Sequence, residues 1–219
     1  DGTITSQVSV NNDYGFSICS FDSPSAYDSS TWGHGLSSAP KWVILKRLDG
    51  SSEWTVYHAG DPSHYFFLNE RNAGAGSNNW TVTSTTVAPG AGLWTALNAP
   101  HIAYCWSEIA GFSKFSSYTG SGASKAVTGL GFRPKYVLMK CSSKGGTSWM
   151  IADSTRGDNQ ILRAHNSDYE TTESISFSFD ADGFSFNTSN DNFNESNQTY
   201  IYAAFAASIP GDPNNDSLV

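Results

Sequence analysis

The feature that most constrains this chain is an internal repeat. The segment from His34 to Lys46 aligns without a gap with Thr128 to Lys140, and Pro40 and Pro134 are 94 positions apart. Three further blocks recur in the same order: Gly15-Phe16-Ser17 with Gly111-Phe112-Ser113, Trp54-Thr55-Val56 with Trp149-Met150-Ile151, and Ile102 to Trp106 with Ile201 to Phe205. A near-constant spacing of about 95 residues, drifting by a few positions as loops change length, predicts two related units in tandem.

Each repeated block has the pattern of a β-strand. Pro40 comes directly before the run from Lys41 to Lys46, and proline suits a strand start because it donates no ladder hydrogen bond. The continuous apolar run predicts a central strand buried on both faces. Because the next strand begins at Trp54, the residues from Arg47 to Glu53, with Asp49-Gly50, are predicted to form a hairpin turn. Lys144-Gly145-Gly146 is expected to do the same in the second copy.

The clearest hairpin signal lies near the C-terminus. Residues Ile175 to Phe179 alternate apolar and polar, Asp182-Gly183 supplies a turn, and Phe184 to Phe186 alternate again. Its counterpart in the first copy is expected at Val82 to Val87, with a turn near Gly90 to Gly92 and a strand from Leu93 onward. The alternation from Asp1 to Asn12 predicts an edge strand.

These signals predict an all-β fold of two tandem, related β-sandwich modules of jelly-roll type, each with six to eight strands. The 20 glycines, with abundant Ser, Thr and Asn, suit turns and disfavour helices. The expected boundaries are 1–110 for the first module with its N-terminal strand, 111–210 for the second, and 211–219 for a C-terminal linker or arm.

With these blocks in place, the chain resembles repeat regions of virion and tail-fibre structural proteins of marine, cyanophage-like tailed bacteriophages. The resemblance extends over Asp1 to Gly211. It depends on the blocks Gly15 to Ile18, Gly33 to Leu36, Ala39 to Lys41, Trp54 to His58, Tyr104 to Glu108, Gly111 to Phe115, Gly131 to Pro134, and Tyr200 to Ala206. It implies a fibre or appendage component, located on the virion or outside the cell, that self-associates, with a homotrimer favoured. It carries no catalytic residues over to this chain.

Charge and cysteine content narrow the classes of partner. The formal net charge of −8 disfavours a broad phosphate-binding surface, so no nucleic acid partner is expected. Cys19, Cys105 and Cys141 are odd in number and form no Cys-x-x-Cys motif, so three buried thiols are predicted rather than disulfides or a zinc site. No apolar run approaches the length of a membrane-spanning helix, so no membrane partner is expected.

The candidate ligand-binding residues are Trp32, Trp80 and Trp94. They lie in or beside polar, Gly-rich segments and have no Trp partner in the second copy. Trp42 and Trp54 do have aromatic partners there, Tyr136 and Trp149, and are therefore predicted to be core. Exposed aromatic rings stack on sugar faces, so the three unpartnered Trp residues predict a surface for a bacterial glycan.

The remaining histidine and carboxylate groups are better explained as structural residues than as metal-binding or catalytic sites. His58, Asp61 and His64 form a histidine-rich loop, and His34 is expected to be a structural turn residue. The acidic group of Asp180, Asp182, Asp191 and Glu195 lacks EF-hand spacing. Glu53 precedes the first Trp strand and Asp153 follows the second; they are not in equivalent positions, and neither lies in a recognisable acid–base context. We therefore predict no catalytic residues, no metal site, no cofactor and no enzymatic activity.

The sequence thus favours a structural and adhesive module of a bacteriophage tail fibre or virion appendage, contributing to attachment at a host surface. Two alternatives stay open at this point. One is a secreted bacterial carbohydrate-binding or adhesion module, and the other, less favoured, is a polysaccharide-degrading enzyme, because carboxylates pair in space rather than in sequence.

Overall fold

The computed structural model describes residues 2–76 and 80–211, and most of the predicted C-terminal arm, residues 212–219, lies outside the described residues. The chain forms two compact units, Asp1–Glu108 and Ile109–Val219, which divide two residues before the expected boundary. Within the described ranges there is no α-helix, only a single 3₁₀ turn at Ala91–Leu93, so the all-β prediction is confirmed. No helix there is long and apolar enough to span a membrane.

Among the described residues each unit contains nine strands, slightly more than predicted, because several are only two residues long and leave no readable pattern. The strands of unit 1 are β1 (Gln7–Asn11), β2 (Phe16–Asp22), β3 (Trp32–Gly33), β4 (Trp42–Arg47), β5 (Thr55–His58), β6 (Phe66–Phe67), β7 (Thr81–Val82), β8 (Thr86–Ala88) and β9 (Pro100–Trp106). The strands of unit 2 are β10 (Ser113–Thr119), β11 (Ser124–Thr128), β12 (Tyr136–Cys141), β13 (Met150–Asp153), β14 (Gln160–Arg163), β15 (Thr171–Thr172), β16 (Ser178–Asp180), β17 (Gly183–Asn187) and β18 (Thr199–Phe205).

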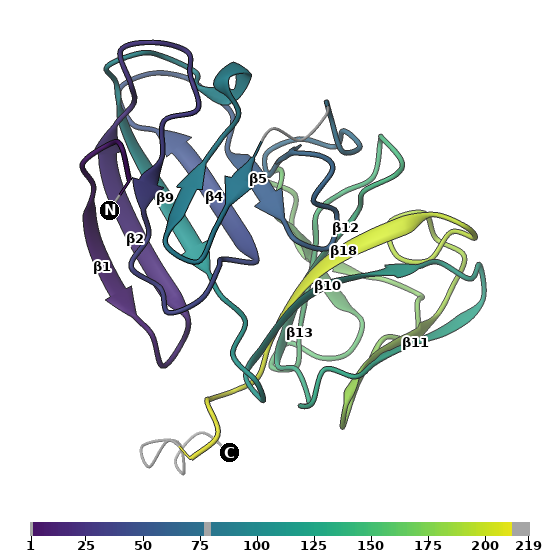
Figure 1. Cartoon of the computed structure of the whole chain (residues 1–219). Coiled ribbons are helices and arrows are strands. Elements are labelled where there is room, and N and C mark those ends of the chain that lie inside the picture. The colour runs from purple at the N-terminus through teal and green to yellow at the C-terminus, as the bar shows by residue number, and fades with distance from the viewer. Residues whose placement is uncertain (1, 77–79, 212–219) are drawn as a thin grey trace. The chain divides into compact units, whose positions relative to one another are not determined.

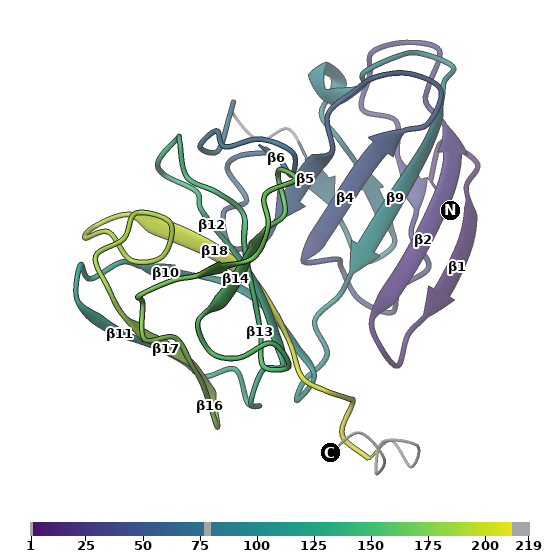
Figure 2. The same cartoon turned by 180° about the vertical axis from the view of Figure 1, so that it is seen from behind.

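Unit 1 is a sandwich of a large and a small antiparallel sheet. The large sheet has the order β1-β2-β9-β4-β5-β6, which can be followed in Figures 1 and 2, and the small sheet has the order β3-β8-β7. The last strand, β9, therefore lies between β2 and β4. Since β2 pairs with β9 while β3 pairs with β8, the long-range pairs are nested, as in the rolled-up hairpin of a jelly roll.

Unit 2 repeats this topology. Its large sheet has the order β10-β18-β12-β13-β14-β15, and its small sheet has the order β11-β17-β16. The closing strand β18 lies between β10 and β12, as β9 lies between β2 and β4 in unit 1, and the pairs β10–β18 and β11–β17 are nested. The two tandem β-sandwich modules therefore share one strand plan, except that, in residues 2–76 and 80–211, no strand of unit 2 corresponds to β1 and no strand of unit 1 corresponds to β15.

The repeated Pro-Lys blocks make the same backbone hydrogen bonds in both units. The N–H of Lys41 donates to Trp106, and the N–H of Lys135 donates to Phe205, each at 2.7 Å. The carbonyls of the same two lysines accept from the N–H groups of Ala59 and Ser154. The block therefore marks the point where β4 in unit 1 and β12 in unit 2 enter the large sheet, each between its two neighbours.

The second lysine of each block stabilises the following hairpin turn. Lys46 Nζ donates to the carbonyl and the hydroxyl of Ser52, and Lys140 Nζ donates to Thr147 Oγ1 at 2.7 Å. Lys140 is fully buried and also donates to the Cys141 carbonyl at 3.0 Å. Because an ammonium group removed from water needs good acceptors, these contacts explain why the repeat retains a lysine inside the fold.

The two cores use different side chains on the same backbone plan. The core of unit 1 is built around Trp32, Trp80 and Trp94, with Cys19 and Cys105 beneath them. The core of unit 2 is dominated by phenylalanine and tyrosine: Phe177, Phe179, Phe184, Phe186, Phe193, Tyr118, Tyr200 and Tyr202. Cys19, Cys105 and Cys141 are buried free thiols, as predicted.

The hairpin predictions were confirmed in unit 2 and partly wrong in unit 1. β16 and β17 pair with Phe179 opposite Phe184, but β16 begins only at Ser178, after the left-handed residue Ser176 (φ 48°). In unit 1 the turn lies at residues 83–85 rather than 90–92. The Thr83 hydroxyl accepts hydrogen bonds from the N–H groups of Thr85 and Thr86, so a threonine forms the turn that was expected at glycine.

The buried lysine gives a direct test of the turn. Thr147→Val removes an acceptor from the buried Lys140 ammonium, so we expect the free energy of unfolding to fall by about 1–3 kcal/mol. In the matched variant Ser52→Ala, the half-buried Lys46 keeps the Ser52 carbonyl and contact with water, so the expected loss is below about 1 kcal/mol. Urea unfolding followed by far-UV circular dichroism checks both values, and equal losses would show that the burial of Lys140 has no energetic role.

Candidate functional site

The structure places Trp32, Trp80 and Trp94 in the core of unit 1, so the prediction that they form an exposed stacking surface was wrong. Their exposed fractions are 0%, 7% and 3%. The ring of Trp32 stacks on Phe21 at 4.5 Å between centroids and meets the edges of the Trp80 and Trp94 rings at 6.4 and 6.0 Å. They lack Trp partners in the second copy because unit 2 fills its core with phenylalanine and tyrosine.

The prediction that Trp42 and Trp54 are core residues was confirmed for Trp42 and wrong for Trp54. Trp42 is 5% exposed and stacks on Trp106 at 4.4 Å. Trp54 is 36% exposed, with Lys46 Nζ lying 5.7 Å from its ring centroid, whereas its repeat partner Trp149 is 2% exposed. Equivalent positions in two repeats thus differ in burial, so an aromatic partner in the repeat is not by itself a sign of a core residue.

The strand registers place corresponding loops at one end of each sandwich, which we call the loop end. In unit 1, Asp22 pairs with Pro100, Arg47 with His101, and Thr55 with Phe67. The loops at this end are 23–31, 48–54, 89–99 and the segment that follows Phe67. In unit 2, the pairs between residues 119 and 199, 141 and 200, and 150 and 163 gather loops 120–123, 142–149, 164–170 and 188–198 in the same way.

Three aromatic rings are exposed at the loop ends of the two units. Tyr27 is 59% exposed in loop 23–31, Trp54 is 36% exposed beside β5, and Tyr169 is 83% exposed in loop 164–170. Neither tyrosine is among the predicted site residues, although each is the only Phe, Tyr or Trp in a run of polar residues. That isolation was the available signal, because a ring without apolar neighbours in sequence has no strand pattern to bury it.

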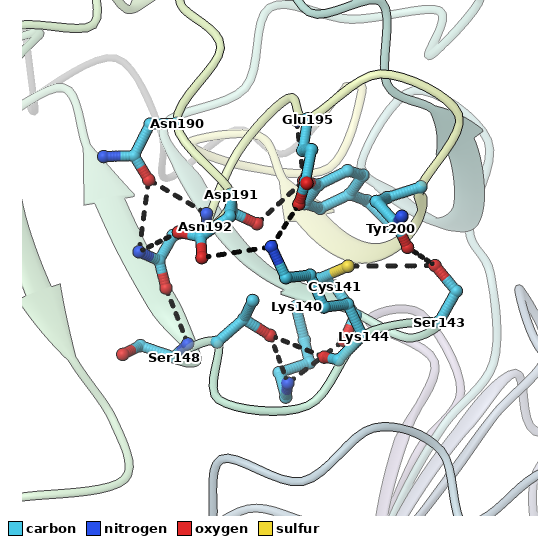
Figure 3. A network of polar contacts seen from close by, with 12 residues as sticks. Lys140, Cys141, Ser143, Lys144, Ser148, Asn190, Asp191, Asn192, Glu195 and Tyr200 are labelled. Atoms are coloured by element: carbon cyan, nitrogen blue, oxygen red, sulfur yellow. Dashed lines mark hydrogen bonds and ion pairs between the residues drawn. The ribbon is translucent and has the colours of Figure 1, made fainter.

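A polar network joins two loops at the loop end of unit 2 (Figure 3). Lys144 Nζ lies 2.5 Å from Glu195 Oε2 and 3.5 Å from Asp191 Oδ2. The hydrogen bond to Glu195 raises the pKa of Lys144 above its ordinary value, with smaller contributions from both nearby carboxylates. The ammonium group therefore connects loop 142–149 to loop 188–198 while its side chain and those of both carboxylates stay about 40% accessible.

Hydrogen bonds between side chains and backbone groups hold this pair of loops in place. Asn192 Oδ1 accepts from the N–H of Ser148 at 2.7 Å, and Asn190 Oδ1 accepts from the N–H of Asn192 at 2.9 Å. The Tyr200 hydroxyl donates to the Asp191 carbonyl at 2.7 Å and accepts from the Glu195 N–H at 2.9 Å. Side chains on these loops are thus held on a fixed backbone, which lowers the entropy cost of binding a ligand.

The loop that carries Tyr169 is also fixed at its base. The Asp168 N–H donates to Asn166 Oδ1, and the Asn166 amide donates to Asp168 Oδ2 at 2.7 Å. Arg156 Nη1 donates to Glu170 Oε2 at 3.0 Å. The exposed ring therefore projects from a short turn whose polar groups are hydrogen-bonded to each other.

The histidines occupy structural positions. His34 is fully buried, and its Nδ1 accepts from the N–H of Leu36 at 3.1 Å, as expected for a turn residue. His58 Nδ1 accepts from the N–H of Gly60, and His64 Nδ1 lies 2.8 Å from Asp61 Oδ1. Among the residues that the structure describes, no three His, Cys, Asp or Glu side chains gather in a way that could hold a metal ion.

The acidic residues near the second hairpin are divided between separate contacts. Asp182 accepts from the N–H groups of Gly131 at 2.7 Å and Gly129 at 2.9 Å, and these two hydrogen bonds lower its pKa. Both glycines have positive φ, 80° and 82°, so their N–H groups converge on the carboxylate. Asp191 and Glu195 instead face Lys144.

The two carboxylates considered for hydrolysis are held by neighbouring side chains. Burial disfavours ionisation of Asp153, but the hydrogen bonds from Arg156 outweigh it and lower the pKa of the carboxyl group. Glu53 accepts a hydrogen bond from the amide of Asn69. A general acid needs a raised pKa, whereas the pKa of Asp153 is lowered. The carboxylate therefore has the environment of a structural ion pair with Arg156.

The fold and the loop ends define a tandem β-sandwich protein with rigid, polar loops and a few exposed aromatic rings. The chain belongs to the family described as "Domain of unknown function (DUF7483)", whose pattern matches residues 1–209. No curated protein and no solved structure matches the chain.

Because Trp32 is buried, removing its side chain is expected to reduce stability strongly. Trp32→Ala empties a buried, stacked position, so we expect unit 1 to lose about 3–5 kcal/mol of unfolding free energy. Trp54→Ala, at the exposed ring, is expected to cost at most about 1 kcal/mol. Tryptophan fluorescence during denaturant unfolding measures both, and a mild effect of Trp32→Ala would restore the surface interpretation of that residue.

The buried histidines predict an acid-sensitive unit 1. Burial lowers the pKa of His34 and of His101 below the ordinary value of about 6.5. Below pH 6.5 the unfolded chain therefore binds protons that the folded chain does not, so stability falls as the pH drops from 7 to 5.

The variant His34→Asn with His101→Asn retains hydrogen-bonding groups at both positions but does not titrate in this range. Calorimetric melting between pH 7 and 5 should therefore show a smaller decrease in Tm for the variant than for the natural chain. The same pH slope in both proteins would contradict the assignment.

Proposed function

We propose that this chain is a structural and adhesive module of a bacteriophage tail fibre or virion appendage, acting outside the cell and not as an enzyme. The support is the repeated sandwich, in which the residues shared by both copies serve strand entry and turn stabilisation. Rigid β-rich repeats suit a mechanical spacer, and the sequence resemblance to phage fibre repeats supports the same role.

The observation that supports an adhesive role is the position of the exposed rings. Tyr27, Trp54 and Tyr169 lie at the loop ends of their units, and each has polar neighbours in the sequence. An aromatic ring beside carboxylate, amide and hydroxyl groups suits the face and the hydroxyls of a sugar. We therefore propose a bacterial surface glycan as the ligand. The candidate binding residues are these three exposed rings and no longer Trp32, Trp80 and Trp94, which are buried.

Single sites of this kind are shallow, so the proposed attachment depends on many copies acting together. Linked weak sites gain overall affinity because each binding event raises the effective concentration at the next. A homo-oligomeric fibre, which the resemblance favours as a trimer, would supply such copies. The net charge of −8 supports a sugar rather than a nucleic acid as the partner.

The test is a glycan array and a whole-cell pull-down with the chain displayed in many copies on beads. We expect binding to a bacterial polysaccharide that falls at least tenfold for Tyr169→Ala combined with Trp54→Ala, because both stacking rings are lost. Lys135→Ala, an exposed residue at the opposite end of the sandwich, should leave binding unchanged.

Two results would overturn the proposal. Binding that survives the loss of both rings would refute the site, and no binding to any polysaccharide or cell would refute the adhesive role. Release of reducing sugar from a bound polysaccharide would identify an enzyme instead, so the supernatant is assayed in the same experiment.

A further inference from the structure

The open edge of β1 offers a surface for self-association. β1 is the end strand of the large sheet of unit 1 and pairs with β2 alone within the described part of the chain. All five of its residues are exposed, and Val8 and Val10 are 39% and 42% exposed. Natural sheets protect such edges with charges, prolines or bulges, but Gln7-Val8-Ser9-Val10-Asn11 contains no charged residue and no proline.

The direction of the peptide groups follows from the neighbouring ladder. The N–H of Ser107 donates to Gly15 and the N–H of Ser23 donates to Ala99, so the odd-numbered residues of β2 turn toward β9. The even-numbered residues of β2 therefore face β1, where they pair with Gln7, Ser9 and Asn11. The N–H and C=O groups of Val8 and Val10 consequently point away from β2, toward the open edge.

The valines of β1 lie next to a part of unit 1 that differs from unit 2. Val8 lies against Gly35, whose position could not hold a Cβ without coming within 2.9 Å of the valine. Gly33 in β3 corresponds to Val127 in unit 2, which is 6% exposed and part of that core. At this position unit 2 therefore has a core valine, whereas unit 1 has a glycine and a slot of about 400 Å³ beside Val8 and Leu36.

We propose that two copies of this chain pair through β1, antiparallel about a two-fold axis at Ser9. The strand has a self-complementary order, an amide, Val, Ser, Val and an amide, so the axis places Val8 opposite Val10 of the second copy and Ser9 opposite itself. Each Val8–Val10 pair exchanges two backbone hydrogen bonds. The four valine side chains then lie on one face of the joined sheet and cover each other.

Unit 2 offers an internal comparison. In the part of the chain that the structure describes, its end strand β10 pairs with β18 alone, and Ser117 and Thr119 on it are exposed. The sequence of β10, with Lys114 and Tyr118, has no such two-fold order. The proposal therefore assigns the contact to β1 with β1 and excludes β1 with β10.

The first experiment measures association by analytical ultracentrifugation up to about 1 mM, because a five-residue edge buries less than a standard interface of about 1,200 Å² and a dissociation constant roughly in the micromolar range or weaker is expected. Val10→Lys, which adds a charge at the edge, should weaken dimerisation at least tenfold. Ser117→Lys, the matched charge on β10, should leave it unchanged. Unaltered association of Val10→Lys, or a loss with Ser117→Lys, would overturn the proposal.

The second experiment uses cross-linking. In the proposed pair Ser9 faces Ser9 of the other copy at a position without direct hydrogen bonds, where Cα atoms are about 4.5 Å apart and a disulfide fits. With oxidised glutathione as oxidant, Ser9→Cys should give a dimer band on non-reducing gels and Ser117→Cys should not. The three natural cysteines are fully buried and serve as the unreactive background. A monomer band only, from a variant with native circular dichroism, would refute the two-fold contact.

Discussion

The insertion of the last strand between two strands from the beginning of the unit, β2 and β4 in unit 1 and β10 and β12 in unit 2, organises both units. β9 and β18 each pair over at least six residues with two neighbours that come much earlier in the chain, and these registers place the loops at the ends of the sandwich. Such pairing closes long loops, so it requires a large gain from burial. The aromatic cores supply it, because each ring buries a large area and its edge-to-face and stacked contacts add to that gain.

The two units show that one strand plan accepts different interiors. Unit 1 packs three tryptophans into its core, whereas unit 2 uses phenylalanine and tyrosine, and the retained positions are those of the Pro-Lys block and its second lysine. Packed cores tolerate changes of side chain when total volume is kept, but a buried ammonium group needs its acceptors in place. This difference explains why Lys46 and Lys140 recur while Trp32 does not.

A rigid scaffold with variable ends is also the basis of the proposed attachment. The loop end of unit 2 is held by the Lys144 network, and Tyr169 projects from a short turn beside it. Loops fixed on a sheet can present polar groups and a ring without ordering cost. The β1 edge lies on the rim of unit 1 and concerns assembly, so the two proposals involve different surfaces and can fail independently.

The sequence by itself determined the duplication and the all-β class. It also indicated the buried strand after each Pro-Lys block, the hairpin of β16 and β17, and the N-terminal edge strand, because period-two patterns and turn residues are local signals. It misassigned Trp32, Trp80, Trp94 and Trp54, and it did not indicate Tyr27 or Tyr169 as site residues. Whether a ring is buried depends on which strands and loops surround it, and residues far apart in the chain supply these. Only the tertiary structure could therefore decide that the isolated tryptophans fill a core, that Lys144 joins two loops, and that the edge of β1 stays open.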